Sequence, residues 1–204
     1  MLFRSREHVV DHPIPGFVTI AGGKYTTYRV MSEDAVNEAV TDLRRIVPDS
    51  CTETVAIVGA DGYLVMMNKL AEVSREYGIT QKSAEHLLNR YGSLFEEVLE
   101  VGQEDLTMFH RISEGLPYLK AEIKYAVTHE SALSVDDVLS RRTRIAFEAK
   151  DQGRAIAPVV AEIIAPTLGW SESEKQASIE DYLDKISRQN DLLENAMRKS
   201  TKVS

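Results

Sequence analysis

The stretch VTIAGGKYTTYR, Val18 to Arg29, decides how the chain is organised, because β-prone residues give way there to a helical pattern. An apolar run ends at Gly22-Gly23, and Lys24 and two threonines follow. Glycines let a backbone approach a flat or anionic ligand closely. The free N–H groups at the start of a helix favour negative charge, and a lysine adds to that preference. A ligand-holding turn and a tight strand-to-helix turn without a ligand both explain these residues, which alone leave the two interpretations open.

The turn does not have the pattern of a nucleoside triphosphate site. A Walker A loop requires glycine, four residues, glycine, lysine and then serine or threonine. Here Tyr25 follows Gly23-Lys24, and Val18 stands where the first glycine belongs. The sequence fails the pattern at both positions, so this class of site is excluded.

Downstream of the turn, the sequence predicts helices almost throughout. Apolar residues at spacings of three and four follow Thr26 or Thr27, either of which can cap the first helix, and Pro48 is expected to end it. A short run over 54–58 is compatible with an extended segment. Further helices are expected from Asp61 to Gly78 and at 80–91, 93–101, 117–128, 135–149, 155–168 and 172–196.

Three local patterns mark where some of these helices begin and end. Gly78-Ile79-Thr80 and Gly169-Trp170-Ser171 each place a glycine at the end of one helix and a hydroxyl at the start of the next. Ser134 with Asp137 resembles a capping arrangement.

Composition limits the class of protein. The chain has 204 residues, 43% hydrophobic and 27% charged, which is ordinary for a soluble globular protein with one sizeable core. A net charge of −8 argues against a general nucleic-acid-binding protein, because such binding needs Lys and Arg to neutralise phosphates. The single cysteine, Cys51, excludes an internal disulfide. No apolar run approaches the roughly 18 to 20 residues that span a bilayer. The opening residues lack a signal-peptide pattern, and a cytoplasmic location is expected.

The first residues are too poor in strands to form a sheet of their own. Short β-prone runs occur at Val9-Val10 and Phe17–Ile20. Parallel strands need sheet neighbours, which the rest of the chain scarcely offers. We therefore expect the opening residues to be the last strand and turn of a larger domain, with the helical part as an independently folding body.

Two segments carry a resemblance to a known family. SREHVV followed by GFVTIAGGKYTTYRVMSEDAV, within 5–36, resembles the end of the flavin domain in FAD-dependent glycerol-3-phosphate dehydrogenases and the related glycerol-phosphate oxidases, where the pattern is G-G-K-x-T-T-Y-R. DDVLSRRTRIAFE, over 136–148, is similar to a segment of the family's helical C-terminal domain. The resemblance covers essentially the whole chain. It departs at Tyr25, where leucine is common, and the family's dinucleotide-binding G-x-G-x-x-G is missing.

The resemblance implies a mainly α fold and an oxidoreductase parent. Residues 1–25 would be a β-strand and loop remnant of the FAD-binding domain, 26–197 a multi-helix C-terminal domain, and 198–204 a disordered tail. The parent would oxidise sn-glycerol 3-phosphate to dihydroxyacetone phosphate and pass electrons through FAD to quinone or oxygen. This chain alone is expected to bind no FAD tightly and to be inactive, because the dinucleotide fold is absent.

The resemblance also implies site residues. The flavin would be lined by Gly22, Gly23, Lys24, Tyr25 and Thr26, with Tyr25 acting through its backbone. Lys24 would also lie near substrate, and Arg6 matches a family arginine that can pair with phosphate. Reduction leaves negative charge at the flavin N1–C2=O edge, which N–H donors and a lysine would stabilise. No residue is assigned as a catalytic base, and no metal site is expected.

The alternative function is a helical docking or dimerisation module of a flavoprotein with no direct chemical role. The expected partners are the remainder of the FAD domain, sn-glycerol 3-phosphate, and quinone or oxygen. Nucleic acid is not expected as a partner. A homo-oligomer and membrane association of the full-length enzyme stay open.

The basic run, the single tryptophan and the histidines are each interpreted as structural rather than functional. The basic run 141–144 is expected to pair with Asp136, Asp137 and Glu148 rather than to bind phosphate. Trp170 is expected to be a packing anchor. The histidines show no spacing typical of a metal site.

Overall fold

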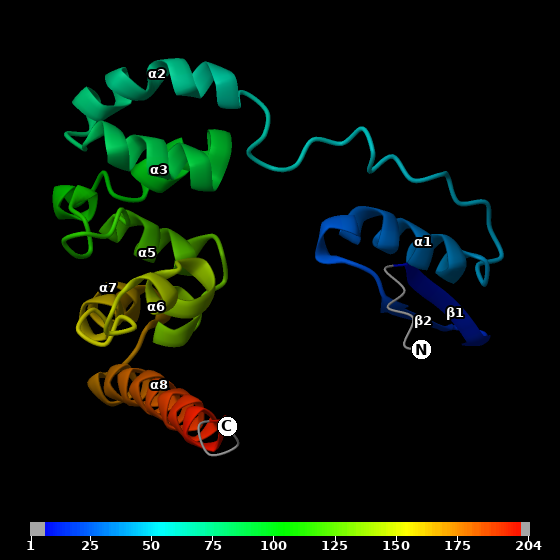
Figure 1. Cartoon of the computed structure of the whole chain (residues 1–204). Coiled ribbons are helices and arrows are strands. Elements are labelled where there is room, and N and C mark those ends of the chain that lie inside the picture. The colour runs from blue at the N-terminus through cyan, green and yellow to red at the C-terminus, as the bar shows by residue number, and fades with distance from the viewer. Residues whose placement is uncertain (1–6, 201–204) are drawn as a thin grey trace. The chain divides into compact units, whose positions relative to one another are not determined.

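The computed structural model describes residues 7–200, with side chains placed from 7 to 197. The chain divides into two compact units, Met1–Ile57 and Val58–Ser204 (Figure 1). Helices dominate the second unit, and the only sheet in the described residues has two strands, so the expected mainly α fold is confirmed.

The first unit is a β-hairpin with one helix packed on it. Strands β1 (His8–Ile14) and β2 (Phe17–Gly22) pair antiparallel, with His8 opposite Gly22. Pro15 and Gly16 form the connecting turn, in which Gly16 takes the positive φ of +79° that suits glycine. The strands therefore pair with each other in a hairpin, and both β-prone runs predicted from the sequence are confirmed.

A short 3-10 turn, η1 (Tyr25–Thr27), leads into helix α1 (Tyr28–Val40), so the helix begins where expected, although the side chain of Thr27 at the cap position makes no capping hydrogen bond. The expectation that Pro48 ends this helix is wrong, because α1 ends at Val40. The hydroxyl of Thr41 donates to the carbonyl of Glu38 at 2.7 Å and closes the last turn. The extended run expected over 54–58 is wrong, because this segment begins with a turn in which the Thr54 N–H donates to the Cys51 carbonyl.

The first unit has no core of its own among the residues that the structure describes. Not one of residues 7–57 is buried. Large apolar side chains of the hairpin, including Val9, Ile14 and Phe17, are more than half exposed. An isolated hairpin is at best marginally stable in water, so this apolar surface is unusual for a finished domain.

The second unit holds every buried residue among those whose side chains are described. It begins with α2 (Tyr63–Glu76), α3 (Gln81–Tyr91), η2 (Gly92–Leu94), α4 (Phe95–Glu100), η3 (Leu106–Phe109) and α5 (Lys120–Thr128). It continues with the π-helix η4 (Asp137–Arg142), α6 (Ile145–Glu148), α7 (Ala157–Leu168) and α8 (Glu172–Ser200). Helix α2 packs on α3, α5 on α7, and α7 on α8 (Figure 1).

Two hydrophobic clusters fill this unit, and α5 contributes to both. Tyr125 belongs to the cluster formed with α2, α3 and α4, whereas Ile123 and Ala126 belong to the cluster formed with α7 and α8. Trp170 packs against the second cluster, which confirms its interpretation as a packing anchor. Because consecutive residues of one helix serve two cores, α5 is the element that joins them.

The predicted helix boundaries at the glycine–hydroxyl junctions are confirmed. Gly78 has a φ of +62°, and the Thr80 hydroxyl accepts the N–H of Ser83 at 3.1 Å. Gly169 has a φ of +66°, and Ser171 forms a reciprocal capping pair with Glu174. These contacts satisfy the backbone groups that helix ends leave unpaired.

The single helix predicted over 135–149 is wrong. It is broken into the π-helix η4 and the short α6, because Thr143 takes an extended conformation between them. Both the N–H and the hydroxyl of Thr143 donate to the carbonyl of Val138 at 2.8 Å. This i to i−5 contact widens the turn and stops the helix.

The two compact units of the structure divide after Ile57. The boundary expected from the sequence, between residues 25 and 26, is a different one, because it marks the edge of a flavin domain. That boundary stays a prediction. Helix α8 runs to Ser200, three residues into the expected tail. Among the described residues, no helix combines the length and apolarity that a membrane crossing requires.

Candidate functional site

The candidate site is the turn that joins β2 to α1. Gly22 and Gly23 have φ values of +81° and +84°, a region that residues with a Cβ rarely adopt. A Cβ on Gly22 would lie 2.8 Å from the carbonyl oxygen of Glu7, and one on Gly23 would lie 2.6 Å from the Sδ of Met31. The local fold alone therefore requires both glycines, as a tight strand-to-helix turn would.

The residues after the glycines are the part of the turn that packing does not explain. The carbonyl of Lys24 accepts both the N–H and the hydroxyl of Thr27 at 3.0 Å. Within residues 7–197, the N–H groups of Tyr25 and Thr26 have no acceptor, and Lys24 forms no ion pair. The side chains of Lys24, Tyr25 and Thr26 are exposed, and that of Tyr25 reaches 93%. This turn can therefore offer two amide donors and a positive charge to an anionic group.

Two histidines of β1 attach the hairpin to α1 and fix the base of this turn. His8 Nε2 lies 2.6 Å from Asp34, and His12 lies 2.9 Å from both Glu38 and Asp42. The hydrogen bond to Glu38, together with that to Asp42, raises the pKa of His12 although burial opposes it.

Sequence reasoning treated the histidines only as metal candidates and missed these pairs. A signal was present, because histidines four apart in a strand share one face, and Asp34, Glu38 and Asp42 have the spacing of four that is typical of one helix face. The backbone N–H of Gly16 also donates to Asp42, which is the main reason that the pKa of Asp42 is lowered.

The structure brings five of the six predicted site residues together, since Gly22 through Thr26 are consecutive. Arg6 lies outside the described residues. The flavin and substrate roles of these residues stay predictions.

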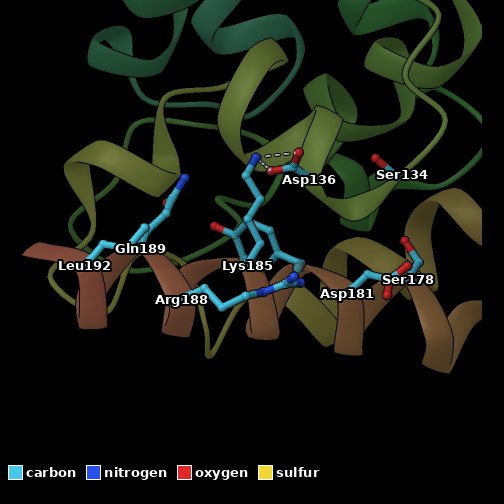
Figure 2. Close-up of a pocket in the computed structure, with 9 residues that line it drawn as sticks. Ser134, Asp136, Ser178, Asp181, Lys185, Arg188, Gln189 and Leu192 are labelled. Atoms are coloured by element: carbon cyan, nitrogen blue, oxygen red, sulfur yellow. Dashed lines mark hydrogen bonds and ion pairs between the residues drawn. The ribbon is translucent and has the colours of Figure 1, made fainter.

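The basic run of the second unit is engaged in ion pairs. Arg141 pairs with Asp136 and, at 3.0 Å, with Asp137, which confirms that interpretation for this arginine. Lys185 of α8 reaches Asp136 at 2.6 Å (Figure 2). Burial opposes ionisation of Asp136, but hydrogen bonds from Lys185, Ser140 and Arg141 outweigh it and lower its pKa.

The other members of that run have different partners. The Nε of Arg142 donates to the carbonyl of Glu130 at 2.7 Å. Glu148 accepts the hydroxyl of Tyr118 at 3.1 Å and forms no ion pair with the run in the described residues, so that part of the prediction is wrong.

A shallow hollow of about 490 Å³ runs along α8 beside the Asp136–Lys185 pair (Figure 2). Its lining includes Asp181, Arg188 and Leu192. Lys185 is already neutralised by Asp136, and Arg188 donates to the carbonyl of Asp184. Because these two cations already have partners, the hollow is a weaker candidate for an anion-binding site than the turn after β2. No cluster of three metal-ligating side chains occurs among the residues described.

A buried polar network that the sequence did not reveal joins α3 to α5. Glu122 is fully buried and lies 3.0 Å from His86 Nε2, and it accepts the N–H of Leu119 at 2.6 Å. The hydroxyl of Tyr91 donates to the same carboxylate at 3.3 Å. Burial, and then the negative charge of Glu122, raise the pKa of Tyr91. The guanidinium of Arg90 lies 3.8 Å from the same carboxylate, and its buried Nε has no hydrogen-bond partner among the described residues. Because Glu122 itself bonds to groups on or next to both helices, the network has the character of a structural joint between them.

The described residues form a helical domain that follows a β-hairpin, a turn and one helix. The chain belongs to the family described as the C-terminal domain of alpha-glycerophosphate oxidase, whose model matches residues 50–175. It is 42% identical over 182 residues to glycerol-3-phosphate dehydrogenase 2 of Mycobacterium tuberculosis (strain ATCC 25618 / H37Rv). It is 43% identical over 178 residues to glycerol-3-phosphate dehydrogenase of Mycobacterium leprae.

These alignments cover most of this chain but a minor part of each relative. They span 89% of the chain and 31% of the tuberculosis protein, and 87% and 30% for the leprae protein. Among solved structures, the glycerol-3-phosphate dehydrogenase from Bacillus halodurans complexed with FAD has a TM-score of 0.67 at 24% identity. That match covers 82% of this chain and 34% of the other, and it supports the fold.

Proposed function

We propose that this chain is the C-terminal part of an FAD-dependent glycerol-3-phosphate dehydrogenase. The parent would oxidise the C2 alcohol of sn-glycerol 3-phosphate to the ketone of dihydroxyacetone phosphate. The observation that carries the proposal is the turn after β2, where two amide donors and Lys24 lack partners among the described residues. Relatives that align with most of this chain bear the name of that enzyme.

The turn fits a flavin edge in shape and in charge. Gly22 and Gly23 let the chain make the tight turn, and the N–H groups of Tyr25 and Thr26 that follow are available as donors. FAD, when bound, would accept the hydride from C2 of the substrate while the hydroxyl proton is lost. Hydrogen bonds to a charged group contribute about 1.5–3 kcal/mol each, and fixed donors need no reorganisation during the reaction. The residues of the turn would thus stabilise the negative charge that reduction leaves.

Lys24 would contribute a full positive charge next to those donors. Its side chain is exposed and forms no ion pair within residues 7–197, so it is available to the flavin or to the phosphate of the substrate. Arg6 would be a second phosphate contact, by resemblance. We assign no proton transfer to any side chain of this chain.

The remaining two thirds of the parent would supply most of the flavin site and the cover for the hairpin. The exposed side chains of Val9, Ile14 and Phe17 suit burial against such a domain. We expect quinone or oxygen to take the electrons from the reduced flavin. We propose a cytoplasmic location for the parent enzyme, with membrane association of the full-length enzyme as the alternative.

The test replaces Lys24 in the full-length protein by methionine, which keeps the length of the side chain and removes its charge. We expect slower reduction by sn-glycerol 3-phosphate and a more negative flavin midpoint potential. Lys24→Arg should retain part of both. Unchanged kinetics and potential in Lys24→Met would refute the role of the turn. Stoichiometric yellow flavin on the isolated 204-residue chain would refute the expectation that FAD binding needs the rest of the parent.

A dimerisation surface is the second candidate function, and helix α8 favours it. Ile179, Ile186 and Leu193 are seven residues apart on one face, yet Ile186 is 3% exposed and Leu193 is 58% exposed. Asn190 bonds to Gln152, and every side chain from 191 to 197 is exposed. The apolar face of α8 thus continues past the body that covers its first half.

The family model matches residues 50–175, so the exposed end of α8 lies beyond the matched residues. Sedimentation of the wild-type protein and of Leu193→Glu tests the surface. A dimer that the substitution dissociates supports it, and equal masses for the two proteins contradict it. Glu180→Gln, an exposed substitution on the packed half of α8, is the control.

A further inference from the structure

We propose that His8, through its ion pair with Asp34, is a positioning residue that holds the Lys24-bearing turn in place for its ligand. The inference rests on the proposed function of that turn. It concerns a residue behind the turn, to which we assign no contact with flavin or substrate. Three independent contacts support it.

The first contact is the strand register. His8 lies directly opposite Gly22, the last residue of β2, so its backbone forms the other side of the hairpin at the point where the turn begins. A change in the position of His8 therefore changes the position of Gly22. Lys24 follows two residues later.

The second contact is the packing behind Gly23. A Cβ built on Gly23 would lie 3.2 Å from the Cβ of His8 and 2.6 Å from the Sδ of Met31. Gly23 is thus enclosed between a strand residue and a helix residue. Because it has no side chain to lock it, its position depends on these two neighbours.

The third contact is the ion pair itself. His8 Nε2 lies 2.6 Å from Asp34, two turns along α1 from the helix start, and the side chain of His8 is 19% exposed. The pair ties β1 to α1, and the turn is the chain segment that connects β2 to the same helix. Fixing the strand relative to the helix therefore fixes both ends of the turn.

His12 extends the same attachment toward the other end of the hairpin. Its two ring nitrogens lie 2.9 Å from Glu38 and from Asp42. The N–H of Gly16 also donates to Asp42, and Arg29 pairs with Glu33 at 2.7 Å rather than with these carboxylates. His12 therefore provides a comparison, since it braces the same two elements at a site remote from Gly22.

The charged surroundings of the two histidines are almost wholly acidic. Strand β1 also carries Asp11, with Glu7 just before it, and β2 has no titratable side chain. Helix α1 presents Asp34 and Glu38, Asp42 lies in the turn just after it, and Lys24 is the basic residue of the turn after β2. Among the described residues, these three carboxylates contact histidine side chains and the N–H of Gly16, and no lysine or arginine.

The experiment uses the full-length protein with FAD bound. We expect His8→Ala to lower the rate of flavin reduction by sn-glycerol 3-phosphate about 10-fold to 100-fold, since displacing a positioned group by a fraction of an ångström has effects of this size. The flavin potential should become more negative. Asp34→Asn should do the same, and the double variant should be no worse than the worse single variant.

Two further variants separate positioning from general stability. His8→Gln keeps an N–H donor toward Asp34 and should restore part of the rate. His12→Gln should reduce the melting temperature to a similar degree as His8→Gln while leaving the flavin potential closer to that of the wild type. His110→Gln, at an exposed histidine of the second unit, is the control for handling and for general effects of the substitution.

The outcomes distinguish this inference from the proposed function. If His8→Ala or Asp34→Asn lowers only the melting temperature and leaves rate and potential unchanged, the positioning role is refuted while the turn keeps its function. If His8→Ala does not fold, His8→Gln and Asp34→Asn still test the positioning role through the same two measurements. Wild-type behaviour of Lys24→Met refutes the proposed function itself.

Discussion

Replacing Glu122 by alanine should destabilise the chain more than any other change to the polar network in the second unit. The carboxylate accepts from the N–H of Leu119 at 2.6 Å, from His86 at 3.0 Å and from the Tyr91 hydroxyl at 3.3 Å. Each buried donor left without an acceptor costs about 1–3 kcal/mol. Water can still reach His86, which is 18% exposed, and this reduces its share.

The expected loss of unfolding free energy is therefore about 3–5 kcal/mol, the range found when one member of a buried charged pair is removed. That is a large part of the roughly 5–15 kcal/mol typical of a domain. Glu122→Gln should lose less, about 1–3 kcal/mol, because the amide oxygen can still accept one of the three hydrogen bonds.

Urea unfolding of the whole chain, followed by far-ultraviolet circular dichroism, measures these values. Glu100→Gln, an exposed carboxylate on the neighbouring α4, is the matched control and should stay within about 0.5 kcal/mol of the wild type. If Glu122→Ala loses less than about 1 kcal/mol, the network does not act as a joint between α3 and α5.

Two more predictions concern other parts of the chain. The pKa of His12 lies above 6.5 in the folded unit, so its stabilising effect is fully present below 6.5 and is lost as the pH rises through the folded pKa. A nuclear magnetic resonance titration of His12 should have its midpoint above 6.5, and a midpoint at or below that value contradicts the pairing with Glu38 and Asp42. Thr143→Val removes one hydrogen bond to Val138 without changing the shape of the side chain, and it should cost about 0.5–1.5 kcal/mol. Thermal unfolding measures that cost, and Thr167→Val, at an exposed threonine of α7, should leave the midpoint nearly unchanged.

Local signals account for the parts of the fold that the sequence predicted well. The Gly78–Thr80 and Gly169–Ser171 junctions need only the conformational freedom of glycine and one hydroxyl within a few residues, and both lie at the predicted positions. The pairing of Arg141 with its acidic neighbours is also local, since the partners lie four and five residues away.

The features that escaped prediction depend on contacts distant in sequence or on unusual local geometry. Glu122 has the sequence context of a solvated helix residue, and only the approach of α3 makes it buried. The π-helix before Thr143 depends on the hydrogen bond from Thr143 to the carbonyl of Val138, five residues earlier. The spacing of apolar residues in the sequence does not predict such a bond. In the turn, the glycines proved to have a structural reason, so the candidate site depends on the amides and the lysine that follow them.

The position of α5 between two cores has a consequence for how the second unit comes apart. Tyr125 packs into one cluster and Ile123 into the other, so neither cluster can open fully while the other keeps this helix ordered. Amide protons in the middle of α5 should then be among the slowest to exchange with deuterated solvent, with those of α2 exchanging earlier. A substitution in an outer helix should destabilise one cluster, whereas a substitution along α5 should destabilise both clusters at once.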